Sequence, residues 1–171
     1  MKAVVLLSKT FFKGHPKAGQ PTYFKQKVLA AQMVIKRPTL HVTLTAPDGS
    51  EVKERKIHTC RANYEYWKKK IDRLKVEGGV LSIRQWSEKP YRSPHEIIVD
   101  IPAETIGVQK LGFGREPDCE RIHCTFVDGK IANFIQIAHN DGLSAADFEA
   151  WFENYDLTQP MAIIHFTNFR Y

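Results

Sequence analysis

The sequence predicts a single α+β domain that spans residues 1–171. Short segments with strand-like alternation make up much of the chain, and a few stretches between them have the three- and four-residue spacing of helices. Hydrophobic residues account for 43% of the chain and charged residues for 26%, which is typical of a soluble globular protein. No repeat, low-complexity tract or linker divides the chain. A chain of this length can bury a substantial core.

The first part of the chain predicts a strand, a loop and a helix. Residues 1–8 contain too short an apolar run for a signal peptide, and no cleavage site follows, so we interpret them as the first strand. Residues 9–22 are rich in Lys, Gly and Pro, which favours a loop. Thr22 is a suitable cap for a helix over residues 23–33.

A β-hairpin and a second helix come next. Residues 40–45 alternate apolar and polar side chains, and Asp48-Gly49 favours a tight turn into a return strand through Val52. Asn63 is a suitable cap for a helix over residues 64–76. This helix has one apolar stripe, which we interpret as core, formed by Tyr64, Trp67, Ile71 and Leu74.

The remaining elements are mostly strands. Ser144 with Asp147 three residues later predicts a capping box for a helix over residues 145–155, and residues 133–140 predict a shorter helix before Gly142. The predicted strands are 80–86, 96–101, 105–111, 122–127 and 161–166. A polar, Pro-containing loop is expected over 87–94.

The net charge of +6 is concentrated in one region. Residues 51–75 contain nine basic and four acidic residues, so they account for most of the excess. A polyanion such as RNA, DNA or a nucleotide suits such a cluster. A solvated helix face with a basic bias has the same composition, and the sequence leaves both interpretations open.

The segment Lys56-Ile57-His58-Thr59-Cys60-Arg61 combines an amine, a hydroxyl and a guanidinium within six residues. These groups can hold a phosphate or polarise a carbonyl, and with a carboxylate they can carry out acyl transfer. Asp141 is the candidate carboxylate. Side chains alternate along an extended segment, so the backbone must bend if Lys56 and Thr59 are to share one site.

These residues also carry a family resemblance. The K-x-x-T-x-R motif, the aromatic helix after it and the late segment Ala138–Ser144 resemble the ASCH domain of the PUA-like superfamily. The chain is most similar to ASCH-like proteins of gut bacteria and their phages, which share blocks like Thr10–Pro16 and Trp86–Tyr91. The resemblance implies a PUA-like mixed β-barrel with short flanking helices, in which approximately residues 34–55 form an inserted hairpin.

The resemblance also implies a function. It predicts an RNA-, nucleotide- or modified-base-binding domain with a basic cleft. In relatives that deacetylate acetylated cytidine, a lysine, a threonine and a glutamate carry the reaction, and they match Lys56, Thr59 and Asp141. The aspartate is shorter than the glutamate by one bond, so whether this chain is an amidohydrolase stays open. The expected ligand-binding residues are Lys56, Arg61, Asn140, Trp86, Tyr91 and Arg92.

Other classes are disfavoured by the sequence. We expect no metal, because the spacings of His58, Cys60, Cys119, His123 and Cys124 are not those of usual zinc sites. We expect no cofactor, and no membrane segment, since no apolar run approaches about 20 residues. Three cysteines that cannot all pair favour a reducing cytoplasm. A non-catalytic protein-interaction module of phage or mobile-element origin is the alternative from another class.

Overall fold

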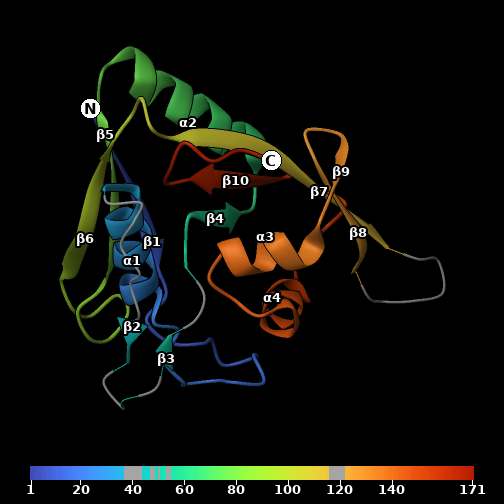
Figure 1. Ribbon diagram of the computed structural model, residues 1–171, viewed down its shortest axis with the longest axis horizontal. Helices are drawn as coiled ribbons and strands as arrows, with labels where there is room; N and C mark the ends of the chain where they lie inside the picture. The colour runs from blue at the N-terminus through green and yellow to red at the C-terminus, as the bar shows by residue number, and fades with distance from the viewer. Residues whose placement is uncertain (37–43, 47–48, 50, 53–54, 116–121) are drawn as a thin grey trace.

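Two main sheets, a two-stranded sheet and four helices form the part of the chain that the computed structural model describes, which is residues 1–36, 44–46, 49, 51–52, 55–115 and 122–171 (Figure 1). The helices are α1 (Phe24–Lys36), α2 (Tyr64–Val76), α3 (Phe134–Asn140) and α4 (Ala145–Phe152). The strands are β1 (Lys2–Leu7), β2 (Leu44–Thr45), β3 (Glu51–Val52), β4 (His58–Arg61), β5 (Val80–Trp86), β6 (His95–Pro102), β7 (Gly107–Arg115), β8 (Ile122–Val127), β9 (Lys130–Ala132) and β10 (Met161–His165).

The strands form two separate main sheets. One has the order β1-β5-β6, with β1 parallel to β5 and β6 antiparallel to it. The other has the order β4-β10-β7-β8-β9, and all of its neighbours are antiparallel. β10 lies between β4 and β7, packs against α2 and is buried along its whole length. The short strands β2 and β3 pair only with each other among the described residues.

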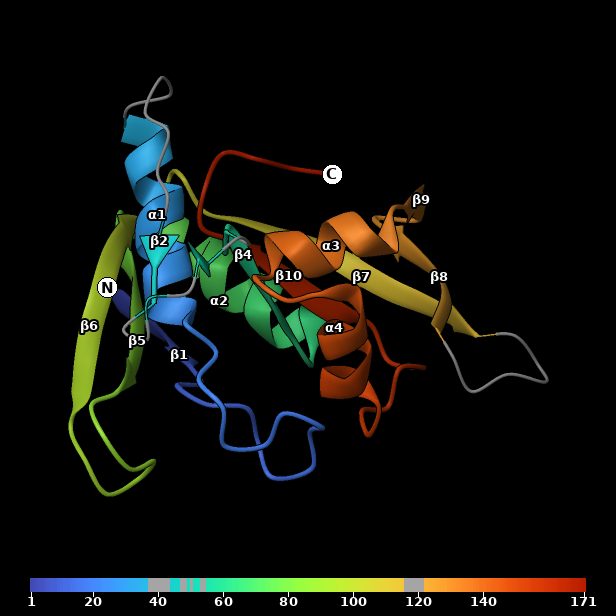
Figure 2. The same cartoon turned by 60° about the horizontal axis from the view of Figure 1, so that its bottom comes forward.

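One hydrophobic core joins the two sheets. It contains apolar side chains of β1 and β5 together with those of β10, α2 and α4. Helix α2 packs against β1, β7 and β10, while α3 and α4 lie on the other side of the five-stranded sheet (Figures 1 and 2). Ile71 and Leu74 of α2 are almost completely buried, and Tyr64 and Trp67 are packed against the core at its edge. The predicted apolar stripe of this helix is therefore confirmed as core.

Two of the three predicted caps are confirmed. Thr22, the predicted cap of the first helix, lies two residues before the start of α1 and accepts a 3.4 Å hydrogen bond from the Phe24 N–H. Asn63 accepts a hydrogen bond from the backbone N–H of Tyr66 at 3.0 Å, which satisfies one of the free donors at the start of α2. The Ser144 hydroxyl accepts one from the N–H of Asp147 at 3.1 Å at the start of α4. Local sequence signals were sufficient here because a cap depends on groups only three residues apart.

The closed barrel is not observed. Among the described residues, β1 pairs only with β5 and β4 only with β10, so no ladder of hydrogen bonds joins the two sheets. The α+β class is confirmed, while the expected closure is wrong for this part of the chain. Strand β9 was not predicted, because three residues after a turn give too short a pattern to recognise.

Some boundaries differ from the predictions. Helix α1 continues three residues past the expected end at residue 33, and α4 ends at Phe152 instead of residue 155. In the predicted hairpin, Leu44 pairs with Val52 and Thr45 with Glu51, which differs by one residue from the register that a two-residue Asp48-Gly49 turn would give, Thr45 with Val52. Residues 40–43 and Asp48 of that hairpin lie outside the described residues.

No described helix is both long enough and apolar enough to cross a membrane.

Candidate functional site

Lys56 and Asp141 meet directly, although 84 residues separate them in the chain. The two residues form an antiparallel β-bridge, and the next backbone contact is a 2.9 Å hydrogen bond from the N–H of Ile57 to the carbonyl of Asn140. The Lys56 ammonium (Nζ) donates to Asp141 Oδ1 at 3.0 Å and to the Asp141 carbonyl at 2.5 Å. The expected proximity of the motif lysine and the late carboxylate is therefore confirmed.

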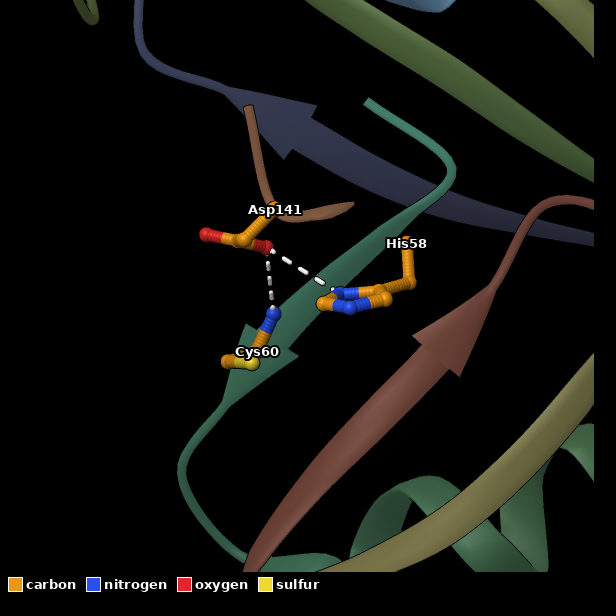
Figure 3. Close-up of side chains that lie close together, drawn as sticks. All are labelled: His58, Cys60 and Asp141. Atoms are coloured by element: carbon orange, nitrogen blue, oxygen red, sulfur yellow. Dashed lines mark hydrogen bonds and ion pairs between the residues drawn. The ribbon is translucent and has the colours of Figure 1, made fainter. Parts of the chain in front are cut away.

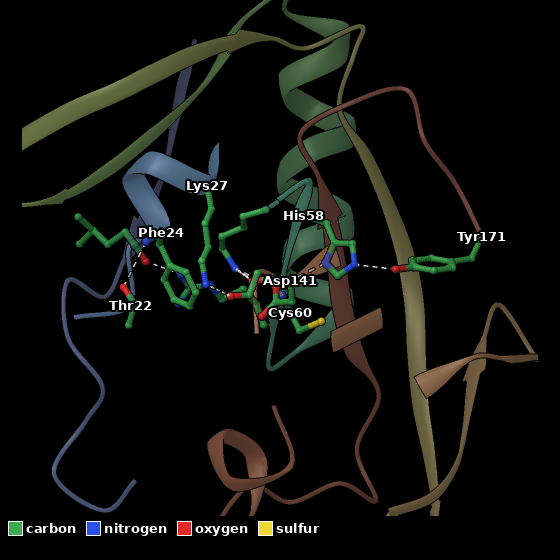
Figure 4. Close-up of polar contacts among 11 residues, drawn as sticks. Thr22, Phe24, Lys27, His58, Cys60, Asp141 and Tyr171 are labelled. Carbon is green, nitrogen blue, oxygen red and sulfur yellow. Dashed lines mark hydrogen bonds and ion pairs between the residues drawn. The ribbon is translucent and has the colours of Figure 1, made fainter. Parts of the chain in front are cut away.

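Helix α1 holds both sides of this bridge. The Lys56 N–H donates to the Lys27 carbonyl at 3.2 Å, and the Lys27 ammonium donates to the Gly142 carbonyl at 2.7 Å (Figure 4). Phe24 of the same helix places its ring 4.1 Å from Lys56 Nζ, which is a cation–π contact. The ammonium is therefore surrounded by a carboxylate, a carbonyl and an aromatic face.

The backbone bends between Lys56 and β4. Residue Ile57 is a bend, after which residues 58–61 follow regular strand pairing with β10. The bend lets Lys56 and Thr59 line the same cleft, as the sequence required for a shared site. His58 and Cys60, two residues apart in the strand, both turn toward the carboxylate of Asp141.

Asp141 is buried and its two oxygens have different surroundings. Oδ1 accepts hydrogen bonds from Lys56 and from the Cys60 N–H at 3.1 Å, and it lies 3.5 Å from His58 Nδ1. The described residues supply no hydrogen bond to Oδ2, although the side chain lines the cleft. This oxygen is the one that can accept a hydrogen bond from a ligand.

The charges of this pair are set by burial and by each other. Burial lowers the pKa of the Lys56 ammonium, and the neighbouring Asp141 charge only partly opposes that shift. Burial alone would raise the pKa of Asp141, but the charge and hydrogen bond of Lys56, together with the nearby His58 imidazole, outweigh it and hold the pKa below its usual value. Asp141 is therefore a carboxylate near neutral pH.

The cleft above this pair has a volume of about 410 Å³ and lies between the two main sheets. Arg61 stands at its wall, where one guanidinium nitrogen donates to the Leu6 carbonyl, and the buried Nε has no hydrogen-bond partner among the described residues. The cleft is lined by Leu6, Leu7, Ser8, Lys9, Thr10, Phe24, Lys56, Thr59, Cys60, Arg61, Trp86, Glu88, Pro90, Tyr91, Asp141, Trp151, Phe152 and Tyr155.

Two aromatic side chains, one at the end of β5 and one in the loop after it, contribute to the cleft. The ring centroids of Trp86 and Tyr91 are 5.3 Å apart, and Trp86 also contacts His95 in an edge-on arrangement. Tyr91 is 89% exposed and has a positive φ of 62°, a strained conformation for a residue with a side chain. A large exposed ring held in such a conformation beside a cleft is available for stacking on a planar ligand.

Two of the expected ligand-binding residues do not line the cleft. Asn140 ends α3 and directs its side-chain amide to the Tyr171 hydroxyl at 2.8 Å, away from the cleft. Arg92 is exposed on the turn that starts at Lys89, and it lies outside the lining. Both are next to true lining residues in sequence, which is why spacing alone did not separate them.

The basic region is not one surface with the cleft. None of the α2 residues lines the cleft. Lys68 pairs with Asp72 and Arg73 with Glu77 one turn along the helix, so much of that positive charge is compensated locally. Only Lys56 and Arg61 of the basic residues described in this region line the cleft. The charge count in the sequence therefore overstates the basic character of the site.

Sequence reasoning missed several aromatic lining residues. Phe24, Trp151, Phe152 and Tyr155 belong to two helices and the turn after α4, and each lies in the cleft wall. No local signal marks them, because an aromatic side chain that lines a cleft has the same sequence pattern as one that fills a core.

Comparisons of this chain with protein-family models, with curated proteins and with solved structures found no match. The functional argument therefore depends on the geometry of the site.

Proposed function

We propose that the cleft binds one unpaired nucleobase, presented as a nucleoside, a nucleotide or an unstacked base of an RNA. The observation that supports this most directly is the combination of Tyr91 and Trp86 at the cleft with Arg61 and with Asp141 Oδ2, which accepts no hydrogen bond from the described residues. A base offers a planar face for stacking and an edge with hydrogen-bond donors and acceptors. The guanidinium supplies donors and the carboxylate oxygen supplies an acceptor.

The size of the cleft supports a small ligand. Sites for small molecules have volumes of about 300–1,000 Å³, and the volume of 410 Å³ falls within this range. A continuous RNA strand would need an open charged groove with several phosphate contacts. We therefore propose that a single base enters the cleft while the rest of any RNA lies outside it. The ASCH-like affiliation, with an open arrangement in place of the PUA-like barrel, is part of this proposal.

Binding can be tested by titrating the protein with nucleosides, nucleotides and short single-stranded or structured RNAs at low salt. The intrinsic fluorescence of the protein is a direct signal, because Trp86 and Trp151 line the cleft. Stacking on an aromatic side chain contributes about 1–3 kcal/mol, so Tyr91→Ala is expected to weaken binding roughly 5- to 150-fold. Tyr66→Ala is the matched control, since Tyr66 is an exposed tyrosine of α2 outside the cleft.

Two results would contradict the proposal. Equal losses in Tyr91→Ala and Tyr66→Ala would place the ligand elsewhere. No binding of any of these probes at low salt would reject nucleic-acid recognition and leave the protein-interaction module as the better hypothesis.

Amide hydrolysis of an acylated base is a second candidate, favoured by the contact between Lys56 and Asp141. The shorter aspartate reaches the lysine because the β-bridge brings the two backbones together. In this reaction Thr59 Oγ1 attacks the amide carbon while Lys56, in its neutral form, accepts the hydroxyl proton. Arg61 stabilises the oxyanion, and the proton that Lys56 took from Thr59 passes through Asp141 to the leaving amine as the C–N bond breaks. An acyl-threonine is then left, which water hydrolyses.

The hydrolysis is tested by incubating the protein with acetylated cytidine and measuring released cytidine. Thr59→Ser keeps the hydroxyl and is expected to keep activity, whereas Thr59→Ala and Lys56→Ala are expected to lose it. Wild-type release no faster than that of Thr59→Ala would end the catalytic hypothesis without affecting the binding proposal.

A further inference from the structure

Three metal-ligating side chains meet beside the cleft. His58 Nδ1, Cys60 Sγ and a carboxylate oxygen of Asp141 all lie within 4.8 Å of one another (Figure 3). His58 and Cys60 come from one face of β4, and the bridge to Lys56 brings Asp141 over that face. All three side chains are buried. The cluster was invisible in the sequence because its third member is some eighty residues from the other two.

A second observation points to a ligand between them. His58 Nδ1 is buried and has no hydrogen-bond partner among the described residues. Its nearest acceptor, Asp141 Oδ1, lies at 3.5 Å, which is too long for a good hydrogen bond. A buried polar atom without a partner costs about 1–3 kcal/mol, and a metal ion bound at Nδ1 would supply the missing partner.

The other nitrogen of His58 is fixed as in known metal sites. His58 Nε2 lies 2.8 Å from the Tyr171 hydroxyl, and that hydroxyl accepts a hydrogen bond from the Asn140 amide at 2.8 Å (Figure 4). Histidine ligands are generally oriented by a hydrogen bond at the nitrogen that does not bind the metal. The Tyr171–Asn140 pair therefore aims Nδ1 toward Asp141 and Cys60.

The spacing of the cluster suits a tetrahedral ion. Two ligands about 2.1 Å from one tetrahedral ion are about 3.4 Å apart, and the His58–Asp141 separation is 3.5 Å. A thiolate about 2.3 Å from the same ion would lie about 3.6 Å from the other two ligand atoms, so Cys60 Sγ, which lies within 4.8 Å of them, would have to approach them by up to about 1.2 Å. Cys60 and Asp141 also line the cleft, which leaves a fourth position for water or a substrate atom.

We propose that His58, Cys60 and Asp141 form a binding site for Zn²⁺ or a similar divalent transition metal. One imidazole, one thiolate and one carboxylate are a ligand set that favours zinc over Mg²⁺ or Ca²⁺, which prefer oxygen alone. The site revises the expectation of no metal. It shares Asp141 with the proposed nucleobase site, but His58 and Cys60 are its own ligands and its test has a different readout.

The Lys56 ammonium would compete with this ion for the Asp141 carboxylate. Its ammonium lies 3.0 Å from Asp141 Oδ1 and occupies the side of the carboxylate that a metal would use. Arg61 adds a second positive charge at the cleft wall. Removal of the Lys56 charge is therefore expected to strengthen metal binding, whereas removal of a ligand weakens it.

The test is a titration of the reduced protein with Co²⁺, followed by the sulfur-to-cobalt charge-transfer absorption, and with Zn²⁺ by calorimetry. The wild type is expected to bind one ion and to show the absorption band. Cys60→Ser is expected to lose the band and to bind Zn²⁺ at least tenfold more weakly. Cys124→Ser, at the other free cysteine that the structure describes, is the matched control and is expected to keep both.

Lys56→Met gives an independent check in the opposite direction. It is expected to bind Zn²⁺ at least tenfold more tightly than the wild type, and far-ultraviolet circular dichroism verifies that each variant is folded. The proposal is overturned if the wild type shows no band, or if the band survives in Cys60→Ser. If the charge-transfer band is lost in Cys124→Ser and kept in Cys60→Ser, the metal binds at another site and the proposal is likewise overturned.

Discussion

At the scale of single residues, Gly142 is the position that lets Asp141 approach Lys56. Gly142 has φ +80°, and a Cβ there would lie 3.1 Å from Lys56 Cβ and 3.3 Å from Lys27 Cδ. Gly142→Ala is therefore expected to combine backbone strain with steric overlap. Gly19 has the same φ with nothing within 4 Å, so Gly19→Ala isolates the strain.

The two alanine variants are expected to differ. Gly19→Ala should lower the free energy of unfolding by about 1–2 kcal/mol, and Gly142→Ala by a further 1–3 kcal/mol or so because of overpacking. Urea denaturation of both variants measures the difference. If the two variants lose the same free energy of unfolding, the residues around Lys56 must move enough to accommodate the added methyl group.

His165 gives the protein a pH-dependent stability. Burial lowers its pKa to about 2, with smaller contributions from His58 and Arg170, and neither ring nitrogen has a partner among the described residues. The unfolded chain protonates His165 near its ordinary pKa of about 6.5. The unfolded state thus binds more protons between these two values, and stability falls as the pH drops below about 6.5.

The expected size follows from the same linkage. Each pH unit below about 6.5 removes about 1.4 kcal/mol, so the wild type should lose about 2 kcal/mol between about pH 7 and pH 5 through His165 alone. His165→Leu is expected to lack this contribution. Denaturant unfolding of both proteins at the two pH values measures it, and parallel losses would contradict a neutral His165 in the native protein.

At the scale of elements, the sequence predicts what depends on neighbours a few residues apart. The Asn63 cap, the α2 stripe and the Ser144 cap follow from local spacing, and each is observed. The reciprocal bond of the predicted capping box is absent among the described residues, because Asp147 accepts from the Ser144 hydroxyl and not from its backbone N–H. The bend at Ile57 was predicted as the condition for Lys56 and Thr59 to line one site, and a bend is observed there. The partners of Lys56 on α1 and the position of Tyr171 beside His58 depend on tertiary packing, so no local pattern predicts them.

Helix α2 is expected to contribute to stability through its buried face alone. Leu74 is 0% exposed in the core shared by both sheets, while Val76, two residues later, is 88% exposed. Leu74→Ala is expected to cost about 2–5 kcal/mol because it leaves a cavity. Val76→Ala should change the free energy of unfolding by less than about 0.5 kcal/mol. Thermal or urea unfolding tests the pair, and similar losses would show that the α2 stripe does not anchor the helix.

At the scale of the whole molecule, the α+β class was predictable but the arrangement of the sheets was not. The parallel pairing of β1 with β5 joins segments about eighty residues apart, and no pattern in either strand specifies its partner. The same holds for the contact of Lys56 with Asp141, which only the family resemblance suggested. Closure of a barrel depends on such long-range pairings. The resemblance predicted a closed barrel, but the pairings that would close it are absent among the described residues.

RNA binding at the cleft and RNA binding along residues 51–75 would depend differently on salt, because the two regions carry different numbers of basic side chains. Uniform contact of RNA with the basic 51–75 region would make affinity fall steeply with salt. In the structure, the cleft is lined by only three cationic side chains among the described residues, and one of them, Lys56, is already paired with Asp141. Lys9 and Arg61 remain, and each phosphate contact with a single strand contributes a slope of about −0.7.

A short RNA that places one base in the cleft is therefore expected to show a slope of log affinity against log salt no steeper than about −1.4. Fluorescence titrations between about 50 and 200 mM salt measure it. Lys69→Ala combined with Lys75→Ala, on the exposed side of α2, should leave both affinity and slope unchanged. A slope steeper than about −3 that this double variant reduces would show instead that RNA binds along α2. The cleft would then have to recognise a ligand of its own.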